Sequence, residues 1–349
     1  MSAGASDRNA PASRTAYDPH AAASRDAHES AKRAAPRFAL GIPARGDEVD
    51  LRGTLDSLVH SAVDAGGAFE VIVALNGPGQ AAARAVAAFV RSSGGVSEGA
   101  VEAETPGAEP PHSAGGAPPL RVLSLPVRSK VAAWNAIRDA ALAPVIVFAD
   151  ADVRVAPVTI ARLLACLEAT PKLALVGARE QASVAPGDGV VARVAALPYR
   201  FVFRNVPGRL YALRSAALPE PMPAHVLHED AYLTVRLGHE RFTKEPGALV
   251  YFRPPATWSE YLRDRVRNEV AKLQLAREFP HLLGAHGVSP YPWTDLLRAL
   301  SPAEYPLLFM LAATRLYARV RARRLVRRGF PTSWSGLPST KRWVGAARV

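Results

Sequence analysis

Short apolar runs alternate with segments of helical periodicity over the first half of the chain. Four runs that are rich in β-branched residues predict buried strands at Arg37–Pro43, Phe69–Leu75, Leu120–Leu125 and Val145–Ala149. Three helices are expected between these strands. The first runs from Leu51 to Val63, the second from the turn after Asn76 to about Val90, and the third over Ser129–Ala141. This alternation is typical of parallel strands with covering helices, so we expect an α/β fold with a Rossmann-like, mostly parallel sheet.

The pattern is less regular after Asp152. A helix is expected to end near Glu168, and strand candidates follow at Leu173–Ala178, Arg209–Leu213 and Ala248–Phe252. A short helix opens at His228, between the last two of these strands. A longer helix begins after Thr257, whose spacing to Glu260 matches a capping box.

Composition divides the chain into three parts. Residues 1–36 contain no apolar stretch and are expected to form a disordered arm that resembles neither a signal peptide nor a transit peptide. The predicted α/β domain spans 37–283, and within it 92–119 is rich in Gly, Ala, Pro, Glu and Ser, which predicts a disordered insertion. Residues 284–349 are expected to form a basic helical extension. Cys166 is the only cysteine, so an intrachain disulfide is excluded and an inert, buried thiol is expected.

The net charge of +12 is concentrated at one end of the chain. Residues 305–349 contain ten Lys or Arg and no Asp or Glu, which leaves only +2 for the rest. A basic nucleic-acid-binding face would require cations distributed over the folded domain, so we expect no nucleic-acid partner. A charge confined to one terminal segment instead favours a local anionic partner, such as a membrane surface.

The segment Tyr305–Arg328 predicts a helix with two faces. An apolar face combines Phe309, Ala313, Leu316, Tyr317 and Val320, and a basic face combines Arg315, Arg319 and Arg323. Such a helix suits a membrane interface, and a core-packed helix with a solvated basic side is the alternative. Because no run of 18 apolar residues occurs, we expect no spanning helix and a cytoplasmic protein that contacts the inner face of the cell membrane peripherally.

Asp150-Ala151-Asp152 directly follows the predicted strand Val145–Ala149. Two carboxylates at the carboxyl end of a buried strand point toward the crevice where open α/β sheets bind ligands. Carboxylate oxygens suit a hard divalent cation, which in turn holds a diphosphate. A solvated pair at a helix start is the alternative. The strand context favours a site for Mg²⁺ or Mn²⁺ at Asp152, with Asp150 nearby.

Six segments follow one another along the chain: Gly41–Arg45, Val71–Asn76, Ser129–Ala136, Asp150–Asp152, Gly208–Arg214 and Glu229-Asp230. They resemble, in the same order, motifs of the family 2 glycosyltransferases. The likeness spans about Phe38 to Arg277. The chain therefore resembles this family of inverting enzymes with a GT-A fold. It departs from the family's Gly-Lys-x-x-x-x-Asn stretch at Ser129, which replaces the glycine.

The resemblance implies a nucleoside diphosphate sugar as donor. The residues implied to bind it are Pro43, Ala44, Arg45, Asn76, Lys130, Asn135, Asp150, Ala151 and Arg267. Asp152 and Asp150 would hold Mg²⁺ or Mn²⁺, which stabilises negative charge on the departing diphosphate. Lys130 would either add positive charge there or anchor its loop by a salt bridge.

The resemblance also implies a general base. The family gives this role to the position of Asp230, with Glu229 beside it, and the base takes the proton of the attacking acceptor hydroxyl. A single displacement of this kind inverts the configuration at the anomeric carbon. The alternative is that both acids only favour a helix N-terminus. His228 is interpreted as structural, with a contact to metal or phosphate as the other possibility.

The acceptor side departs from the processive members of the family. Their Gln-x-x-Arg-Trp is replaced by Asp264-Arg265-Val266-Arg267-Asn268, so we predict a non-processive enzyme with a saccharide or lipid-linked acceptor. Arg263, Arg265 and Arg267 either reach the diphosphate or are solvated. One alternative is a sugar-phosphate nucleotidyltransferase, which would need a Gly-rich basic loop where only Ala44-Arg45-Gly46 stands. The other is a catalytically silent membrane or nucleic-acid binder.

Overall fold

The computed structural model describes residues 35–77, 79–92, 118–201, 205–286, 293–330, 337–341 and 343. The chain divides into two units, Met1–Ala35 and Pro36–Val349, and every described helix and strand belongs to the second. Most of the predicted N-terminal arm and most of the predicted insertion lie outside the described residues. The domain limits expected at 36 and 283 therefore stay predictions.

A mixed eight-stranded sheet forms the centre of the second unit within the described ranges. Its strands are β1 (Phe38–Arg45), β2 (Phe69–Asn76), β3 (Leu120–Leu125), β4 (Val145–Ala149), β5 (Val153–Val155), β6 (Leu175–Ala182), β7 (Leu210–Arg214) and β8 (Phe242–Phe252). They lie in the order β3-β2-β1-β4-β7-β6-β8-β5. The first four strands are parallel, as the alternation of strands and helices predicts. Strand β7 runs antiparallel to both β4 and β6, and β8 is parallel to β6 and antiparallel to β5.

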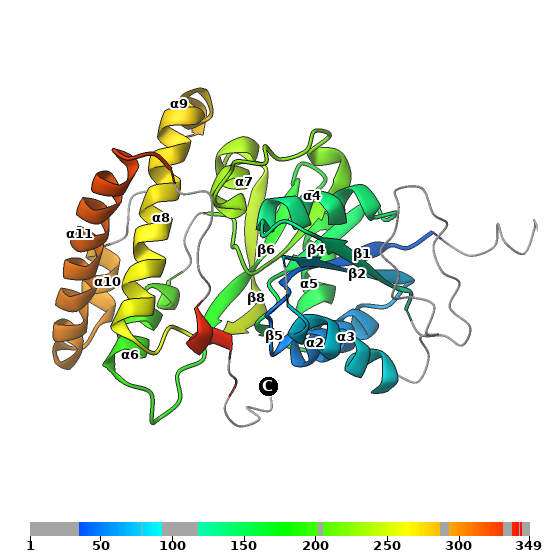
Figure 1. Ribbon diagram of the computed structural model, residues 1–349, viewed down its shortest axis with the longest axis horizontal. Helices are drawn as coiled ribbons and strands as arrows, with labels where there is room; N and C mark the ends of the chain where they lie inside the picture. The colour runs from blue at the N-terminus through cyan, green and yellow to red at the C-terminus, as the bar shows by residue number, and fades with distance from the viewer. Residues whose placement is uncertain are drawn as a thin grey trace, which may run out of the picture. The chain divides into compact units, whose positions relative to one another are not determined.

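Helices cover both faces of the sheet (Figure 1). The described helices are α2 (Leu51–Ala65), α3 (Ala81–Ser92), α4 (Lys130–Ala140), α5 (Thr159–Ala169), α6 (Val190–Ala196), α7 (Glu229–Leu237), α8 (Trp258–Glu278), α9 (Pro280–His286), α10 (Trp293–Ala299) and α11 (Tyr305–Val326). Helices α2, α3 and α5 share one hydrophobic core with the sheet, and α4 and α7 share the core on the opposite face. The predicted α/β architecture is thus confirmed.

Strand β1 shows why the central strands have no polar face. Phe38, Leu40 and Ile42 belong to the core beneath α2, α3 and α5, whereas Ala39 belongs to the core beneath α4. Because both faces are covered, the strand is apolar up to Ala44. Gly41 lies against α4, and a Cβ atom there would be only 2.6 Å from Cγ2 of Ile137. Glycine therefore allows the close approach of α4 to the strand.

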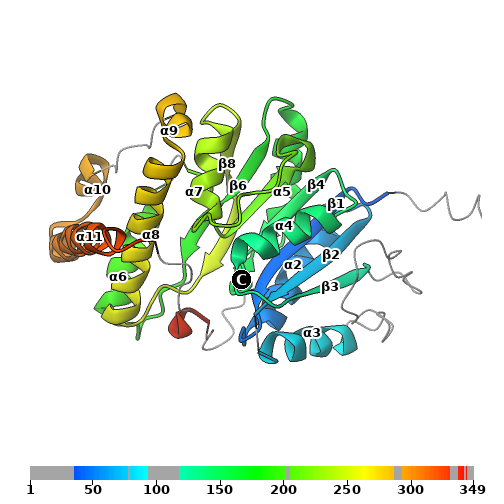
Figure 2. The ribbon, with the colours of Figure 1, turned by 45° about the horizontal axis from the view of Figure 1, so that its top comes forward.

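Helix α11 packs against α8 on the side away from the sheet, and the two helices run in different directions (Figure 2). Its buried face consists of Leu307, Leu311, Thr314, Ala318 and Ala322. The small side chains of Ala318 and Ala322 form one cluster with Val266 and Val270 of α8. The predicted tail helix is confirmed, and one of its faces packs on the domain. None of the described helices combines the length and the apolar character needed to cross a membrane.

Local predictions differ from the structure in three places. Val153–Val155, where no strand is expected, forms the short strand β5 on β8. Strand β8 begins at Phe242, whereas the sequence predicts a start at Ala248. The earlier part of the strand was missed because polar residues and Pro246-Gly247 interrupt its apolar pattern. Helices α6, α9 and α10 have no counterpart among the predicted elements. Cys166, expected to be buried, is only partly buried, and this burial raises the pKa of its thiol.

Candidate active site

A cleft of about 1490 Å³ lies at the carboxyl ends of the central parallel strands, with α8 and α11 contributing to its wall. It brings together most of the residues that the sequence predicts as a site: Pro43, Arg45, Asn76, Lys130, Asp150, Ala151, Asp152, Glu229, Asp230 and Arg267. Two predicted donor-binding residues do not line it. Ala44 is fully buried, and the side-chain amide of Asn135 exchanges two hydrogen bonds with the backbone of Met222, at 2.8 and 2.9 Å.

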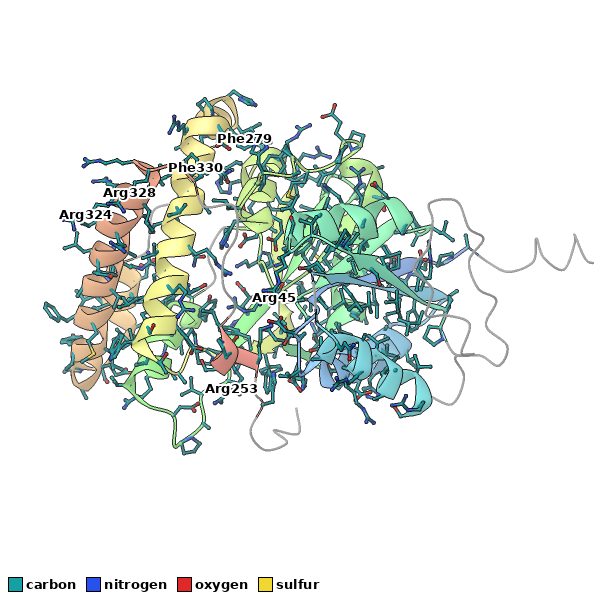
Figure 3. The ribbon with its side chains drawn as sticks, viewed as in Figure 1. Arg45, Arg253, Phe279, Arg324, Arg328 and Phe330 are labelled. Carbon is teal, nitrogen blue, oxygen red and sulfur yellow. The ribbon has the colours of Figure 1, made fainter. Side chains whose placement is uncertain are left out.

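One end of the cleft is built by the loops after β1 and β2. Arg45 ends β1 and makes a bidentate ion pair with Asp47, at 2.7 and 3.0 Å. Figure 3 shows Arg45 on the side of the sheet that faces α8. Asn76 ends β2 and is buried, and its Nδ2 donates to the carbonyl of Ala44 at 3.0 Å. Ala44 therefore acts through its backbone, by fixing the side chain of Asn76.

The Asp150-Ala151-Asp152 turn joins β4 to β5 at the centre of the cleft. The backbone N–H of Asp150 donates to the carbonyl of Arg209 at 2.9 Å, which fixes the turn against the residue before β7. Burial and the neighbouring charge of Asp150 raise the pKa of Asp152 to about 6. The charge of Asp150 thus disfavours the charged form of Asp152.

Lys130 connects the two acidic parts of the site. Its Nζ lies 2.6 Å from Oδ1 of Asp150 and also forms an ion pair with Glu229. Burial alone would lower the pKa of Lys130, but these two carboxylates raise it, so the lysine stays charged. Ser129 caps α4 by accepting a hydrogen bond from the backbone of Ala132, which explains a serine before the lysine. Of the two roles predicted for Lys130, the structure shows the salt bridge.

Asp230 lies in the first turn of α7, where it lines the cleft with its side chain 25% exposed. Its Oδ1 accepts a hydrogen bond from the backbone of Ala231 at 2.8 Å and lies 3.4 Å from Nδ1 of His228. Although burial opposes the charged form, the hydrogen bond and charge of His228 hold the pKa of Asp230 well below its usual range. By contrast, burial raises the pKa of Glu229, which Lys130 only partly offsets.

Arg209 is a site residue that the sequence analysis did not single out. It precedes β7, pairs with Glu180 at 2.7 Å, and places its guanidinium 3.6 Å from the ring centroid of Phe252. Burial would lower the pKa of Arg209, but Tyr199, Glu180 and Asp150 raise it. The cation therefore contributes positive potential beside the Asp150–Asp152 turn. A charged residue directly before a buried apolar strand was the available signal.

The helical wall of the cleft is rich in arginine. Arg265 and Arg267 line it and share Asp264, at 2.5 and 3.0 Å, whereas Arg263 is absent from the lining residues. From α11, Arg315 and Arg319 also line the cleft. The basic face predicted for that helix is therefore divided, because two of its three arginines line the cleft.

The donor set at the turn fits a shared divalent cation rather than an all-protein metal cage. The described residues contain no group of three or more acidic, histidine or cysteine side chains arranged to hold a metal. Asp150 and Asp152 supply two carboxylates, and their mutual repulsion is what a divalent cation between them would relieve. Mg²⁺ is commonly held by one or two carboxylates together with substrate phosphates and water.

Comparisons with known proteins bear on the fold. No protein-family model matches the chain, and no curated protein matches it by sequence. A mannosyltransferase from Pyrobaculum calidifontis, solved with GDP-Man and Mn²⁺, aligns with a TM-score of 0.50 and 16% identity over 91% of this chain and 84% of that one. The fold is that of the GT-A glycosyltransferases.

Two further solved structures align less well. The S. aureus protein TarS gives a TM-score of 0.43 at 12% identity, over 83% of each chain. Glucosyl-3-phosphoglycerate synthase from Mycobacterium tuberculosis, solved with Mn²⁺, UDP and phosphoglyceric acid, gives 0.44 at 20% identity, over 71% of this chain and 80% of that one.

Proposed function

We propose that this protein is a non-processive, inverting glycosyltransferase that moves a sugar from a nucleoside diphosphate to a hydroxyl acceptor. The observation that carries the proposal is one cleft with two sets of carboxylates, in which the pKa of Asp152 is raised and the pKa of Asp230 is lowered. Asp150 and Asp152 form one group and Asp230 belongs to the other, with Lys130 and Glu229 between them. The GT-A fold and the GDP-Man and Mn²⁺ bound by its Pyrobaculum neighbour support the assignment.

In this proposal the donor binds across the loops that end β1, β2 and β4. Pro43, Arg45 and Asn76 would surround the nucleoside, and Asp152 with Asp150 would hold the divalent cation. When bound, Mg²⁺ or Mn²⁺ neutralises charge that develops on the diphosphate as it leaves. Arg209 and Lys130 add fixed positive charge at the same turn.

Asp230 is proposed as the general base. It is ionised, it lines the cleft, and its Oδ2 is left to face Gly208 while Oδ1 is held by the backbone of Ala231. A carboxylate in this state can accept the proton of an acceptor hydroxyl as that oxygen attacks the anomeric carbon. Attack from the face opposite the leaving diphosphate inverts the anomeric configuration. Glu229 is buried and forms an ion pair with Lys130. Its proposed role is to fix the position of Lys130 between Asp150 and α7, and not to exchange protons.

The exposed side of α11 supports the proposal of peripheral membrane contact. Its outer face consists of Tyr305, Phe309, Leu316, Tyr317 and Val320, and all five side chains are exposed. Phe309 and Leu316 are 76% and 64% exposed, which is unusual for large apolar residues on a helix that already packs by another face. An occupant with an apolar interior is therefore expected to cover this outer face.

Arginines beyond the outer face favour an anionic lipid surface as that occupant. Arg323, Arg324, Arg327 and Arg328 are exposed at the end of the helix, and no acidic residue follows Glu304 in the chain. Figure 3 shows Arg324 and Arg328 projecting from α11 on the side away from the sheet. Apolar side chains that insert between lipids, with arginines that contact their phosphates, match this arrangement.

The transfer reaction itself tests the proposal. The full chain is incubated with labelled GDP and UDP sugars, Mn²⁺, and panels of saccharide and lipid-linked acceptors, and the anomeric configuration of each product is determined. We expect metal-dependent transfer from one donor class with inversion. A product with retained configuration would contradict the role of Asp230, and transfer of a nucleotidyl group instead of a sugar would contradict the reaction class.

A further inference from the structure

A segment near the C-terminus lies across the donor end of the cleft. Residues 337–341 and 343, here called the C-terminal strap, include the short 3₁₀ helix Pro338–Lys341. In Figure 1 this red segment lies between α8 and the sheet. Leu337, Thr340 and Lys341 line the same cleft as Asp150 and Asp152, although nearly 200 residues separate the two segments in the chain.

The strap is anchored on α8. The backbone N–H of Ser339 donates to Oε1 of Glu260 at 3.1 Å, and its hydroxyl donates to Oε2 of the same carboxylate. The hydroxyl in turn accepts from the backbone of Ala256 at 3.0 Å. Glu260 is buried and also belongs to the cap of α8, because Thr257 accepts from its backbone N–H. The strap is thereby attached where α8 begins.

The other side of the strap contacts the Asp150–Asp152 turn. The Thr340 hydroxyl donates to the carbonyl of Leu337 at 2.9 Å and lies 3.4 Å from Oδ2 of Asp152. The indole N–H of Trp343 donates to the backbone carbonyl of Asp152 at 3.3 Å. The guanidinium of Arg154 lies 4.9 Å from the Trp343 ring centroid. The strap therefore contacts both the side chain and the backbone of Asp152.

Lys341 adds a cation beside the loop after β1. It forms an ion pair with Glu48, a residue only 2% exposed in that loop. Both residues line the cleft, so the ammonium group of Lys341 neutralises a carboxylate at the donor end. An unpaired carboxylate there would repel a diphosphate, and Lys341 offsets its charge.

We infer that the C-terminal strap is a wall of the donor site, in which Thr340 positions Asp152 and Lys341 lowers the electrostatic cost of binding a nucleoside diphosphate. The inference rests on the proposed function, because it assumes that the cleft takes such a donor. Geometry carries it: one short segment bridges α8, the loop after β1 and the Asp150–Asp152 turn.

Calorimetric titration of GDP and UDP in the presence of Mn²⁺ tests the inference. The variants are Lys341→Ala, Lys341→Arg, Thr340→Val and a chain that ends at residue 336. Lys172→Ala removes an exposed lysine on the α5–β6 turn and is the matched control. We expect roughly tenfold weaker nucleotide binding for Lys341→Ala and Thr340→Val and a larger loss for the truncation, with wild-type affinity for Lys172→Ala and near-wild-type affinity for Lys341→Arg.

The possible outcomes separate the strap from the proposed function. Thermal unfolding of each variant is measured, and the point variants carry the conclusion if the truncated chain does not fold. If the wild type binds the nucleotide and Lys341→Ala and Thr340→Val bind it with the same affinity, the role of the strap is overturned and the proposed function stands. Absence of nucleotide binding by the folded wild type would overturn the proposed function and the inference with it.

Discussion

Glu229 and Asp230 are adjacent in the chain but have different environments. Glu229 is buried against Lys130, which leaves its pKa raised, whereas His228 and the first turn of α7 hold the pKa of Asp230 low. Neighbouring carboxylates with opposite shifts commonly have different roles. The structure thus separates two acids that the sequence presents as one motif, and gives the ionised position to Asp230.

The substitution Asp230→Asn tests the general base. It preserves the shape of the side chain and removes its capacity to accept a proton, so we expect transfer to fall by about 100-fold or more. Nucleotide affinity should stay near the wild-type value. Asp139→Asn, on an exposed position of α4, is the matched control. Full transfer activity in Asp230→Asn, measured as product formed per enzyme, would remove Asp230 from the mechanism.

The substitution Lys130→Met tests the ion pairs at the centre of the site. It leaves Asp150 and the buried Glu229 without their shared cation. We expect the free energy of unfolding to fall by about 1–2 kcal/mol, a moderate loss because the lysine side chain is 39% exposed. The loss should shrink as the pH falls, since protonation removes the unpaired charges. Urea unfolding at several pH values measures this, and equal stability of both proteins at neutral pH would contradict it.

At the scale of elements, the close approach of β7 to α7 places the proposed base. A Cβ atom on Gly208, two residues before β7, would lie 2.9 Å from Oδ2 of Asp230. We expect Gly208→Ala to displace this carboxylate and lower kcat at least tenfold, with little change in donor KM. Gly189→Ala meets no atom within 4 Å and is the control. Steady-state kinetics decides, and an unchanged kcat for Gly208→Ala would show that this contact does not position the base.

The central strands could be predicted because their physical signal is local. Burial on both faces makes β1 and β4 apolar runs, and β2 is apolar from Val71 to Leu75; the motif residues follow directly at their ends. The antiparallel direction of β7 leaves no such signal, since the short apolar run from Leu210 to Leu213 gives no information about strand direction. Strand β5 has only three residues and depends on pairing with β8, which lies far away in the chain.

At the scale of the whole molecule, the site depends on residues that the sequence cannot place. Thr340 and Lys341 lie in a segment where composition gives only charge, and their contacts with Asp152 and Glu48 depend on how the chain returns past α8. For Asn135 and Ala44 the resemblance implied donor contacts, but the structure places them behind the cleft wall. A motif indicates which residues gather at a site, whereas packing decides which of them face it.

The outer face of α11 gives a prediction about the molecule's surroundings. We expect sedimentation with vesicles that contain anionic lipid, weaker sedimentation with neutral vesicles, and loss of binding at high salt. The double substitution Phe309→Ser with Leu316→Ser should abolish sedimentation without changing nucleotide affinity. Val63→Ser, at a 60% exposed apolar position on α2, is the control. Equal sedimentation of the double variant and the wild type would contradict membrane contact through this face.

The most direct test of the central claim is calorimetric titration of UDP, GDP and dTDP into the wild-type protein and into Asp152→Ala, with Mn²⁺ and with EDTA. We predict that one nucleotide binds the wild type in Mn²⁺, and that EDTA or the loss of the Asp152 carboxylate weakens this binding at least tenfold. Failure of the folded wild type to bind any of the three would contradict the account of this cleft as a nucleotide-sugar site. Equal nucleotide affinity in Mn²⁺ and in EDTA would contradict the assignment of a divalent cation to Asp152.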